Sequence, residues 1–415
     1  MQESQASGCV TAGPETMSRM ARPRTSSPAA MTAYSFLGAA LVSASSSAAT
    51  PLYRLYQQTL HLTPLMITLV FAVYAISLLA ALLTLGSLSD YVGRRPVILG
   101  GLLLNAAAMI FFAHANSVEE LILARAVQGF CVGVAATAFG AAILDTSRTR
   151  GPLLNSLTAF AGLLVGSLGS AALVAFAPNP LHLVYEVLLG LTALLIVLLY
   201  WMPETVSRVP GALGSLRPQI SVPRQSRAIL IRLTPATIAT WALGGFQMSL
   251  MPTVVAATMT GAPWISNLVL PIMLLVATGA VALSRNWPAA RVILIGTGAL
   301  WVGVALSLLG IAQHGVGVLI AGSIIAGFGF GLSFAGTLRT LLPTAEPHQR
   351  AGLLSAFYVE SYLAFSLPAV AAGLSVPYAG LATVTYVYGA VVIVLSMISM
   401  VASLRSGRPA QAASG

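Results

Sequence analysis

Two ionisable residues stand inside long apolar stretches of this sequence, and their chemistry limits what the chain can do. Glu360 lies in Ser355-Ala-Phe-Tyr-Val-Glu-Ser-Tyr-Leu363, about ten residues into an apolar run. That spacing corresponds to a depth of about 15 Å in a hydrocarbon core of about 30 Å. Desolvation favours the neutral form of a carboxyl group at such a depth, and membrane carboxylates commonly mark proton or substrate pathways. We predict that Glu360 is a protonation site; the alternative is a protonated carboxyl group that only hydrogen-bonds to a neighbouring helix.

The second such residue, Arg125, lies in Leu123-Ala-Arg-Ala-Val-Gln-Gly-Phe-Cys-Val-Gly133. An arginine inside a membrane span costs several kcal/mol unless it is paired or hydrated, so it needs partners. Gln128 and Gly129, at i+3 and i+4, share its helix face. This face predicts a coupling or substrate pathway, or alternatively a structural arginine bonded to carbonyl groups of neighbouring helices. We place no other strongly charged residue well inside a span.

The composition requires a membrane to surround these residues. The chain has 57% hydrophobic and 7% charged residues and a mean hydropathy of +0.89, whereas a soluble domain carries about 25% charged residues. The net charge of +10 could indicate nucleic acid as a partner, but the basic residues lie in short connections between apolar segments, where topology explains them. Cys9 and Cys131 form no metal or disulfide pattern. We therefore expect a polytopic membrane protein with no cofactor, no metal, no nucleic-acid partner and a lipid bilayer around it.

The apolar segments predict an all-α fold of twelve transmembrane helices in two six-helix bundles. A span needs about 20 apolar residues, and candidates lie at 32–52, 64–88, 94–114, 118–144, 152–177, 181–202, 233–259, 264–284, 289–313, 316–342, 349–373 and 378–404. The corresponding regions are a disordered N-terminal tail (1–30), a first bundle (31–202), a linker (203–232), a second bundle (233–404) and a C-terminal tail (405–415).

The arginines predict the orientation of these helices. The two tails and the alternate connections that include the linker hold 18 of the 20 basic residues, all of them arginine. Because cytoplasmic connections carry the excess of positive charge, we expect both termini and the linker to be cytoplasmic.

The connection between the second and third spans reads Gly86-Ser-Leu-Ser-Asp-Tyr-Val-Gly-Arg-Arg-Pro96. It resembles the signature loop G-x-L-x-D-x-x-G-R-R of the major facilitator superfamily, and Arg125 to Gly129 resembles that family's motif R-x-x-Q-G, which is associated with proton coupling. The resemblance covers nearly the whole chain after residue 31. The resemblance implies two six-helix halves that give alternating access to a site near the middle of the membrane. Without the resemblance, the charges of the loop could be explained by membrane topology alone.

The resemblance also implies roles for the loop residues. It assigns conformational switching to Gly86, Asp90, Gly93, Arg94, Arg95 and Asp145. In the family an acid at the position of Asp145 pairs with the signature arginine, here Arg94, which leaves Asp90 for the positive N-terminus of the helix expected at 349–373. The alternative for Asp145 is a solvated loop acid. Cavity-lining candidates, which packing could equally explain, are Ser46, Trp241, Gln247, Phe330 and Tyr358.

These observations predict a secondary active transporter of a small organic solute, coupled to protons, monomeric, in the cytoplasmic (inner) membrane, with export favoured over import. A proton-coupled uptake symporter for a small metabolite is the first alternative, and a non-transporting receptor or scaffold with the same fold is the second. The chain is not expected to be an enzyme, because its five histidines fall at span ends or in connections. It also has no G-x-x-x-x-G-K-[ST] loop for ATP.

Overall fold

The computed structural model describes residues 27–147, 149–218, 220–259, 261–346 and 349–406. These residues form helices joined by short connections, with no strand in the described part of the chain. Twelve helical stretches are long and apolar enough to cross a bilayer, so the predicted all-α, twelve-span fold is confirmed. Residues 1–26 of the predicted N-terminal tail and 407–415 of the C-terminal tail lie outside the described residues.

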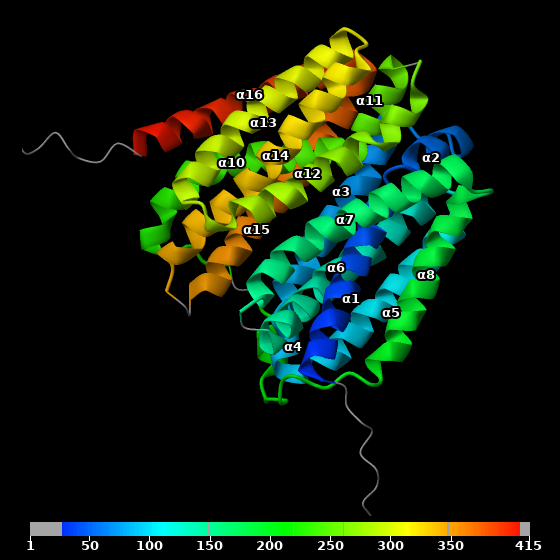
Figure 1. The fold of residues 1–415 in the computed structure, drawn as a ribbon. Coiled ribbons are helices and arrows are strands. Elements are labelled where there is room, and N and C mark those ends of the chain that lie inside the picture. The colour runs from blue at the N-terminus through cyan, green and yellow to red at the C-terminus, as the bar shows by residue number, and fades with distance from the viewer. Residues whose placement is uncertain (1–26, 148, 219, 260, 347–348, 407–415) are drawn as a thin grey trace, which may run out of the picture.

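The first half of the chain forms one bundle (Figure 1). Its helices are α1 (Pro28–Ala48), α2 (Tyr53–Thr59), α3 (Pro64–Leu85), α4 (Leu88–Val92), α5 (Arg94–Ala113), α6 (Val118–Thr146), α7 (Gly151–Phe176) and α8 (Pro180–Leu199). Helix α6 is the most buried of the six spans of this half, because it packs against α1, α3 and α5.

The second half forms the other bundle, after a linker that holds the short helix α9 (Ala212–Ser215). Its elements are α10 (Arg224–Ser249), α11 (Met251–Thr258), η1 (Pro263–Asn267), α12 (Val269–Leu283), η2 (Ser284–Asn286), α13 (Ala289–Ala312), α14 (Val316–Leu341), η3 (Leu342–Thr344), α15 (Arg350–Ala379) and α16 (Leu381–Ser406).

The first span of each half is interrupted in the same way. Helix α1 ends at Ala48, three residues before Pro51, and α10 ends at Ser249, three residues before Pro252. Because proline has no N–H and clashes with the preceding turn, each proline ends one helix and permits another to start. The short helices that follow, α2 and α11, lie beside each other (Figure 1). We call this the α2/α11 end of the molecule, and the opposite end, which holds α4, α9 and the first turn of α15, the linker end.

Two predicted connections are shorter in the structure than in the sequence analysis. Helix α10 begins at Arg224, inside the predicted linker 203–232, because its arginines are good helix formers and extend the helix beyond the apolar segment. Helix α15 continues to Ala379, through the connection expected at 374–377. Gly380, with φ 79°, then makes the whole turn into α16, a conformation that glycine adopts without strain.

The two halves touch at the α2/α11 end and in the middle of the spans. The Thr50 hydroxyl donates to the Met248 carbonyl at 3.2 Å, and the Thr253 hydroxyl donates to Gln57 Oε1 at 3.2 Å. Deeper in the bundle, the rings of Phe71 on α3 and Phe365 on α15 lie 4.7 Å apart, centroid to centroid. These contacts hold the halves together at the α2/α11 end and in the middle of the spans.

Candidate functional site

Arg94 is the centre of a charged cluster at the linker end. Its side chain is 8% exposed. Its Nε donates to Asp145 Oδ2 at 3.0 Å, while its Nη1 donates to Ser89 Oγ at 2.8 Å and to Asp90 Oδ1. The cluster therefore joins the short helix α4, the start of α5 and the end of α6 through one guanidinium group.

The structure places Asp90 differently from the sequence-based assignment. Asp145 does pair with Arg94, as the family resemblance implies, but Asp90 pairs with Arg94 as well, and among the described residues it has no ion pair with the N-terminus of α15. The reason is local: Asp90 and Arg94 are four residues apart, and Gly93, at φ 104°, turns the chain so that both side chains lie on the same side. The roles of Gly86, Asp90, Gly93, Arg94, Arg95 and Asp145 in switching stay predictions.

Glu204 completes this cluster, although the sequence analysis did not select it. Its two carboxylate oxygens accept the backbone N–H groups of Arg94 and Arg95 at 2.8 and 3.0 Å. A carboxylate at this position satisfies the free N–H groups at the start of α5 and interacts favourably with the helix dipole. A Cβ on Gly93 would lie 2.7 Å from Glu204 Oε2, so the glycine makes room for this contact. The signal in the sequence was an acid directly after Pro203, at the end of the first half.

Arg125 is 1% exposed and held by polar groups of three helices. Its Nη1 donates to the Ser46 carbonyl at 3.0 Å and to Gln128 Oε1 at 2.6 Å, and its Nη2 donates to the Tyr53 hydroxyl at 2.6 Å. Its guanidinium carbon lies 5.4 Å from the ring centroids of Tyr53 and Tyr74 and 5.6 Å from that of Phe112. Aromatic faces and carbonyl oxygens thus stabilise this cation, since none of its described contacts is a carboxylate.

Gly129 serves the packing of the helix that carries Arg125. A Cβ at this position would lie 2.2 Å from the carbonyl oxygen of Tyr74. The backbones of α3 and α6 therefore approach closely at this point, which brings the Tyr74 ring to the guanidinium group of Arg125. Gln128 is also fully buried, and its Nε2 donates to the Ser45 carbonyl at 2.9 Å.

Glu360 lies on α15, ten residues after Arg350, with Thr234 of α10 beside it. The Thr234 hydroxyl itself donates to the Leu230 carbonyl at 3.1 Å. Glu360 Oε1 is buried and has no hydrogen-bond partner. Tyr358 and Tyr362 are two residues away on either side, so they point about 200° around the helix from Glu360. Glu360 is therefore on the side of α15 that is opposite to its two tyrosines, next to α10.

The tyrosines of α15 belong to an aromatic cluster between the two halves. The Trp241 ring lies 5.2 Å from that of Tyr362 and 5.7 Å from that of Phe365, and the tilted rings of Tyr358 and Tyr362 lie 6.2 Å apart. Three of the predicted cavity-lining residues, Trp241, Phe330 and Tyr358, are half-buried in or beside this cluster. Phe330 reaches the first half directly, because its ring lies 6.0 Å from that of Phe160 on α7.

The other two predicted cavity-lining residues lie elsewhere. Ser46 is 1% exposed and belongs to the Arg125 site, and Gln247 is 2% exposed and lies in a small cleft among α10, α13 and α16. Both side chains are buried inside their own half, and Gln247 Oε1 has no hydrogen-bond partner there. A further acid inside a span, Glu186 on α8, was not recognised in the sequence; it is exposed and only six residues after Pro180.

Among the described residues, no group of three or more His, Cys, Asp or Glu side chains could hold a metal ion.

Comparisons with known proteins agree with this architecture. The family model described as Major Facilitator Superfamily matches residues 35–359. The multidrug resistance protein MdtM of Escherichia coli (strain K12) is 32% identical over 134 residues, which are 30% of this chain and 31% of MdtM. The uncharacterized transporter YebQ of the same strain is 29% identical over 203 residues, 48% of this chain and 42% of YebQ. The matches thus span less than half of each of these curated relatives.

Solved structures resemble the chain over a longer stretch. The nucleoside transporter NupG superposes with a TM-score of 0.67 at 14% identity, covering 90% of this chain and 98% of NupG. The xylose transporter XylE from E. coli, in a partially occluded inward-open conformation, gives a TM-score of 0.69 at 14% identity, covering 89% of this chain and 96% of XylE. At such identities the likeness concerns the fold.

Proposed function

Because the chain belongs to the Major Facilitator Superfamily and is a transporter of that family, we propose that it exports a small organic solute across the cytoplasmic membrane in exchange for protons. Glu360 carries this proposal. It is an acid at about half the depth of the membrane, with a buried carboxyl oxygen that accepts no hydrogen bond. A carboxyl group in that position can take up a proton on one side of the transport cycle and release it on the other.

The arrangement of the two halves supports alternating access as the mechanism. The halves are held together at the α2/α11 end by Thr50 and Thr253, and deeper in the bundle by the Phe71–Phe365 contact. The Arg94 cluster lies at the linker end, where it can stabilise one state of the cycle through Asp90 and Asp145. With the arginine-rich linker end in the cytoplasm, the contacts of Thr50 and Thr253 would then close the outer side in the state seen here.

Export is favoured over uptake by two observations. The interface between the halves is aromatic and largely apolar around Trp241, which suits amphipathic organic compounds better than sugars. The relatives MdtM of E. coli and MdtL of Shewanella oneidensis, 32% identical over 111 residues, are named multidrug resistance proteins. We expect the protein to work as a monomer, with both termini in the cytoplasm.

The experiment uses everted membrane vesicles that contain the protein. Candidate solutes come from an untargeted metabolite and toxicant-susceptibility comparison of cells with and without it. Adding a true substrate to vesicles with an imposed inside-acid pH gradient is expected to dissipate part of the gradient, which fluorescence of a pH-sensitive amine reports. Vesicles without the protein are the control. Substrate accumulation that persists after an ionophore has collapsed the pH gradient would contradict proton coupling.

A further inference from the structure

Arg125 lies at the point where the first span is interrupted, and it satisfies part of the backbone that the interruption leaves free. Helix α1 ends at Ala48, so the carbonyl groups of its last turn have no partner within the helix. Inside a membrane such groups need other partners. Arg125 Nη1 donates to the carbonyl of Ser46 at 3.0 Å, and Gln128 Nε2 donates to that of Ser45 at 2.9 Å. The positive charge also lies at the negative end of the α1 dipole, which favours a buried arginine whose described contacts include no carboxylate.

The same guanidinium group fixes the segment that follows the interruption. Its Nη2 donates to the Tyr53 hydroxyl at 2.6 Å, and Tyr53 is the first residue of α2. Tyr53 and Ser46 are both buried, although they lie on opposite sides of the break at Pro51. One side chain of α6 therefore determines how the end of α1 and the start of α2 lie relative to each other.

Both of these segments also carry a hydrogen bond to the second half. The Thr50 hydroxyl donates to the Met248 carbonyl at 3.2 Å. Gln57 Oε1 accepts a hydrogen bond from the Thr253 hydroxyl, also at 3.2 Å. We call these two hydrogen bonds the latch. Thr50 lies four residues after the carbonyl group that Arg125 holds, and Gln57 lies four residues after the tyrosine that it holds.

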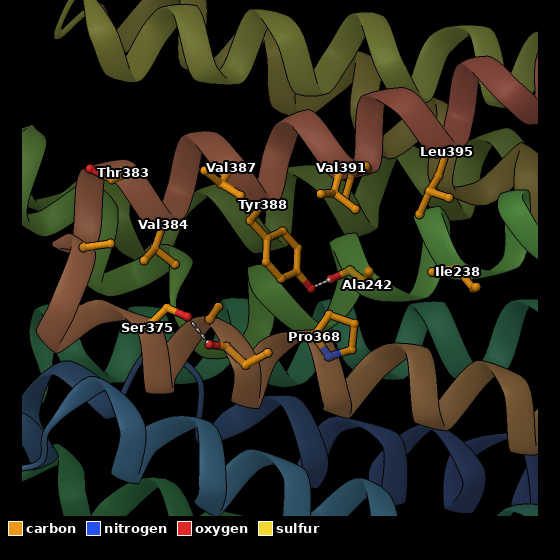
Figure 2. Close-up of a pocket in the computed structure, with 14 residues that line it drawn as sticks. Ile238, Ala242, Pro368, Ser375, Thr383, Val384, Val387, Tyr388, Val391 and Leu395 are labelled. Atoms are coloured by element: carbon orange, nitrogen blue, oxygen red, sulfur yellow. Dashed lines mark hydrogen bonds between the residues drawn. The ribbon is translucent and has the colours of Figure 1, made fainter.

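The second half holds its side of the latch by other means. In the lining of an aliphatic groove among α10, α15 and α16, the Tyr388 hydroxyl donates to the Ala242 carbonyl at 2.7 Å (Figure 2). The Tyr388 ring also lies 4.5 Å from that of Phe246, centroid to centroid. Helix α16 thus fixes α10 just before Met248. The Met248 carbonyl lies in the last turn of this interrupted helix, and its described side-chain partner is Thr50 of the first half.

We propose that Arg125 is a positioning residue for the closure of the α2/α11 end. It holds the end of α1 and the start of α2 in the place where Thr50 and Gln57 meet the second half. The physical reason is preorganisation, because a segment that is fixed before two surfaces meet loses less conformational entropy when they do. The inference rests on the proposed alternating access for the movement that closes this end. It gives Arg125 a role in gating that requires neither a proton nor a substrate at its guanidinium group.

Two tyrosines of α2 offer a matched pair of variants. Tyr53→Phe removes only the hydroxyl group that Arg125 reaches, whereas a substitution of Arg125 would also leave the carbonyl of Ser46 without this partner. Tyr56→Phe is the control, because Tyr56 is equally buried on the same short helix and its hydroxyl donates to the Tyr185 hydroxyl at 3.2 Å, within the first half. Only the first of these variants separates α2 from Arg125.

The test measures the distance across the α2/α11 end, without transport, in purified full-length protein in lipid nanodiscs. Spin labels are attached to His182→Cys, near the start of α8, and to Gln313→Cys, directly after α13, where both native side chains are exposed. Cys9 and Cys131 are first replaced. Double electron–electron resonance then gives the populations of short distances, in which this end is closed, and of long distances. Thermal melting shows that each variant is folded.

We expect Tyr53→Phe to raise the ratio of long to short distances at least about threefold, the size expected when one or two side chains must be ordered on closing. Tyr56→Phe should leave the ratio unchanged. Thr50→Val combined with Thr253→Val removes the latch hydroxyl groups and should also raise the ratio. Adding Tyr53→Phe to that latch variant should have no further effect, because a residue that acts through the latch then has nothing left to position.

An unchanged ratio in Tyr53→Phe would overturn the proposal. An equal rise in Tyr56→Phe would do so too, since any anchor of α2 would then serve. A further rise when Tyr53→Phe is added to the latch variant would place the effect of Tyr53 outside the latch. An unchanged ratio in the latch variant itself would show that the latch does not hold the halves together, which also overturns the proposal. None of these results depends on proton coupling, so the vesicle assay tests the proposed function independently.

Discussion

Arg94 Nε lies 3.0 Å from Asp145 Oδ2, and the same guanidinium group binds Asp90. One buried cation therefore holds two acids that belong to different helices. Asp145 is the more buried of the two, since its side chain is 29% exposed compared with 56% for Asp90. An exposed ion pair contributes little to stability, so we expect the Asp90 contact to matter for the transport cycle more than for folding.

Asp90→Asn is expected to reduce transport at least about tenfold while the affinity for substrate changes less than tenfold, or under ~1.4 kcal/mol. The amide keeps the shape of the side chain but cannot balance the charge of Arg94. Transport in proteoliposomes and equilibrium binding are compared for the same preparation. Glu119→Gln, which removes an exposed carboxylate at the α2/α11 end, is the matched control. Normal transport by Asp90→Asn would remove this contact from the mechanism.

Gly129→Ala is expected to lower both the thermal stability and the yield of folded protein. Its new Cβ would lie 2.2 Å from the Tyr74 carbonyl oxygen, so α3 and α6 must separate, at a cost of about 1–3 kcal/mol. Gly169→Ala is the control, because no heavy atom lies within 4 Å of its new Cβ. That change should be neutral or slightly stabilising. Equal melting temperatures for the two variants would show that the close approach at Gly129 does not matter.

The sequence predicted the features of this protein that depend on local pattern. Apolar segment length located all twelve spans, and the spacing of Arg125, Gln128 and Gly129 placed them on one face. It did not predict contacts that depend on how helices pack. The aromatic rings of Tyr53, Tyr74 and Phe112 reach Arg125 from three other helices, and Glu204 reaches Arg94 across 110 positions of sequence. Gln247 shows the same limit, because only packing decides which side of α10 faces its neighbours.

The arginine distribution predicts that the linker end is cytoplasmic, and single cysteines can test this. Leu213, on α9, is 85% exposed, and Gln313, at the α2/α11 end, is also exposed. With Cys9 and Cys131 replaced, a membrane-impermeant thiol reagent added to intact cells should label Gln313→Cys and spare Leu213→Cys. Permeabilised cells, in which both should react, are the control. The reverse pattern in intact cells would mean that the protein is inserted the other way round.

Glu360→Gln is expected to abolish uphill transport driven by a pH gradient and to leave folding and membrane insertion intact. Glutamine has almost the same volume and still offers an oxygen that can accept a hydrogen bond, but it cannot release a proton. A structural glutamate should therefore tolerate the change, whereas a coupling residue should not. Exchange of substrate across the membrane without a gradient is measured in the same vesicles and should persist.

Arg125→Lys separates geometry from charge in the same assay. Lysine keeps the positive charge but loses the planar group that reaches Ser46, Gln128 and Tyr53 together. We expect it to lose both uphill transport and exchange, because the attachment of α6 to α1 and α2 depends on those contacts. Proton coupling is assigned to the carboxyl group if Glu360→Gln loses only uphill transport while Arg125→Lys loses both uphill transport and exchange. Uphill transport with unchanged pH dependence in Glu360→Gln would make Glu360 structural and place the coupling group elsewhere.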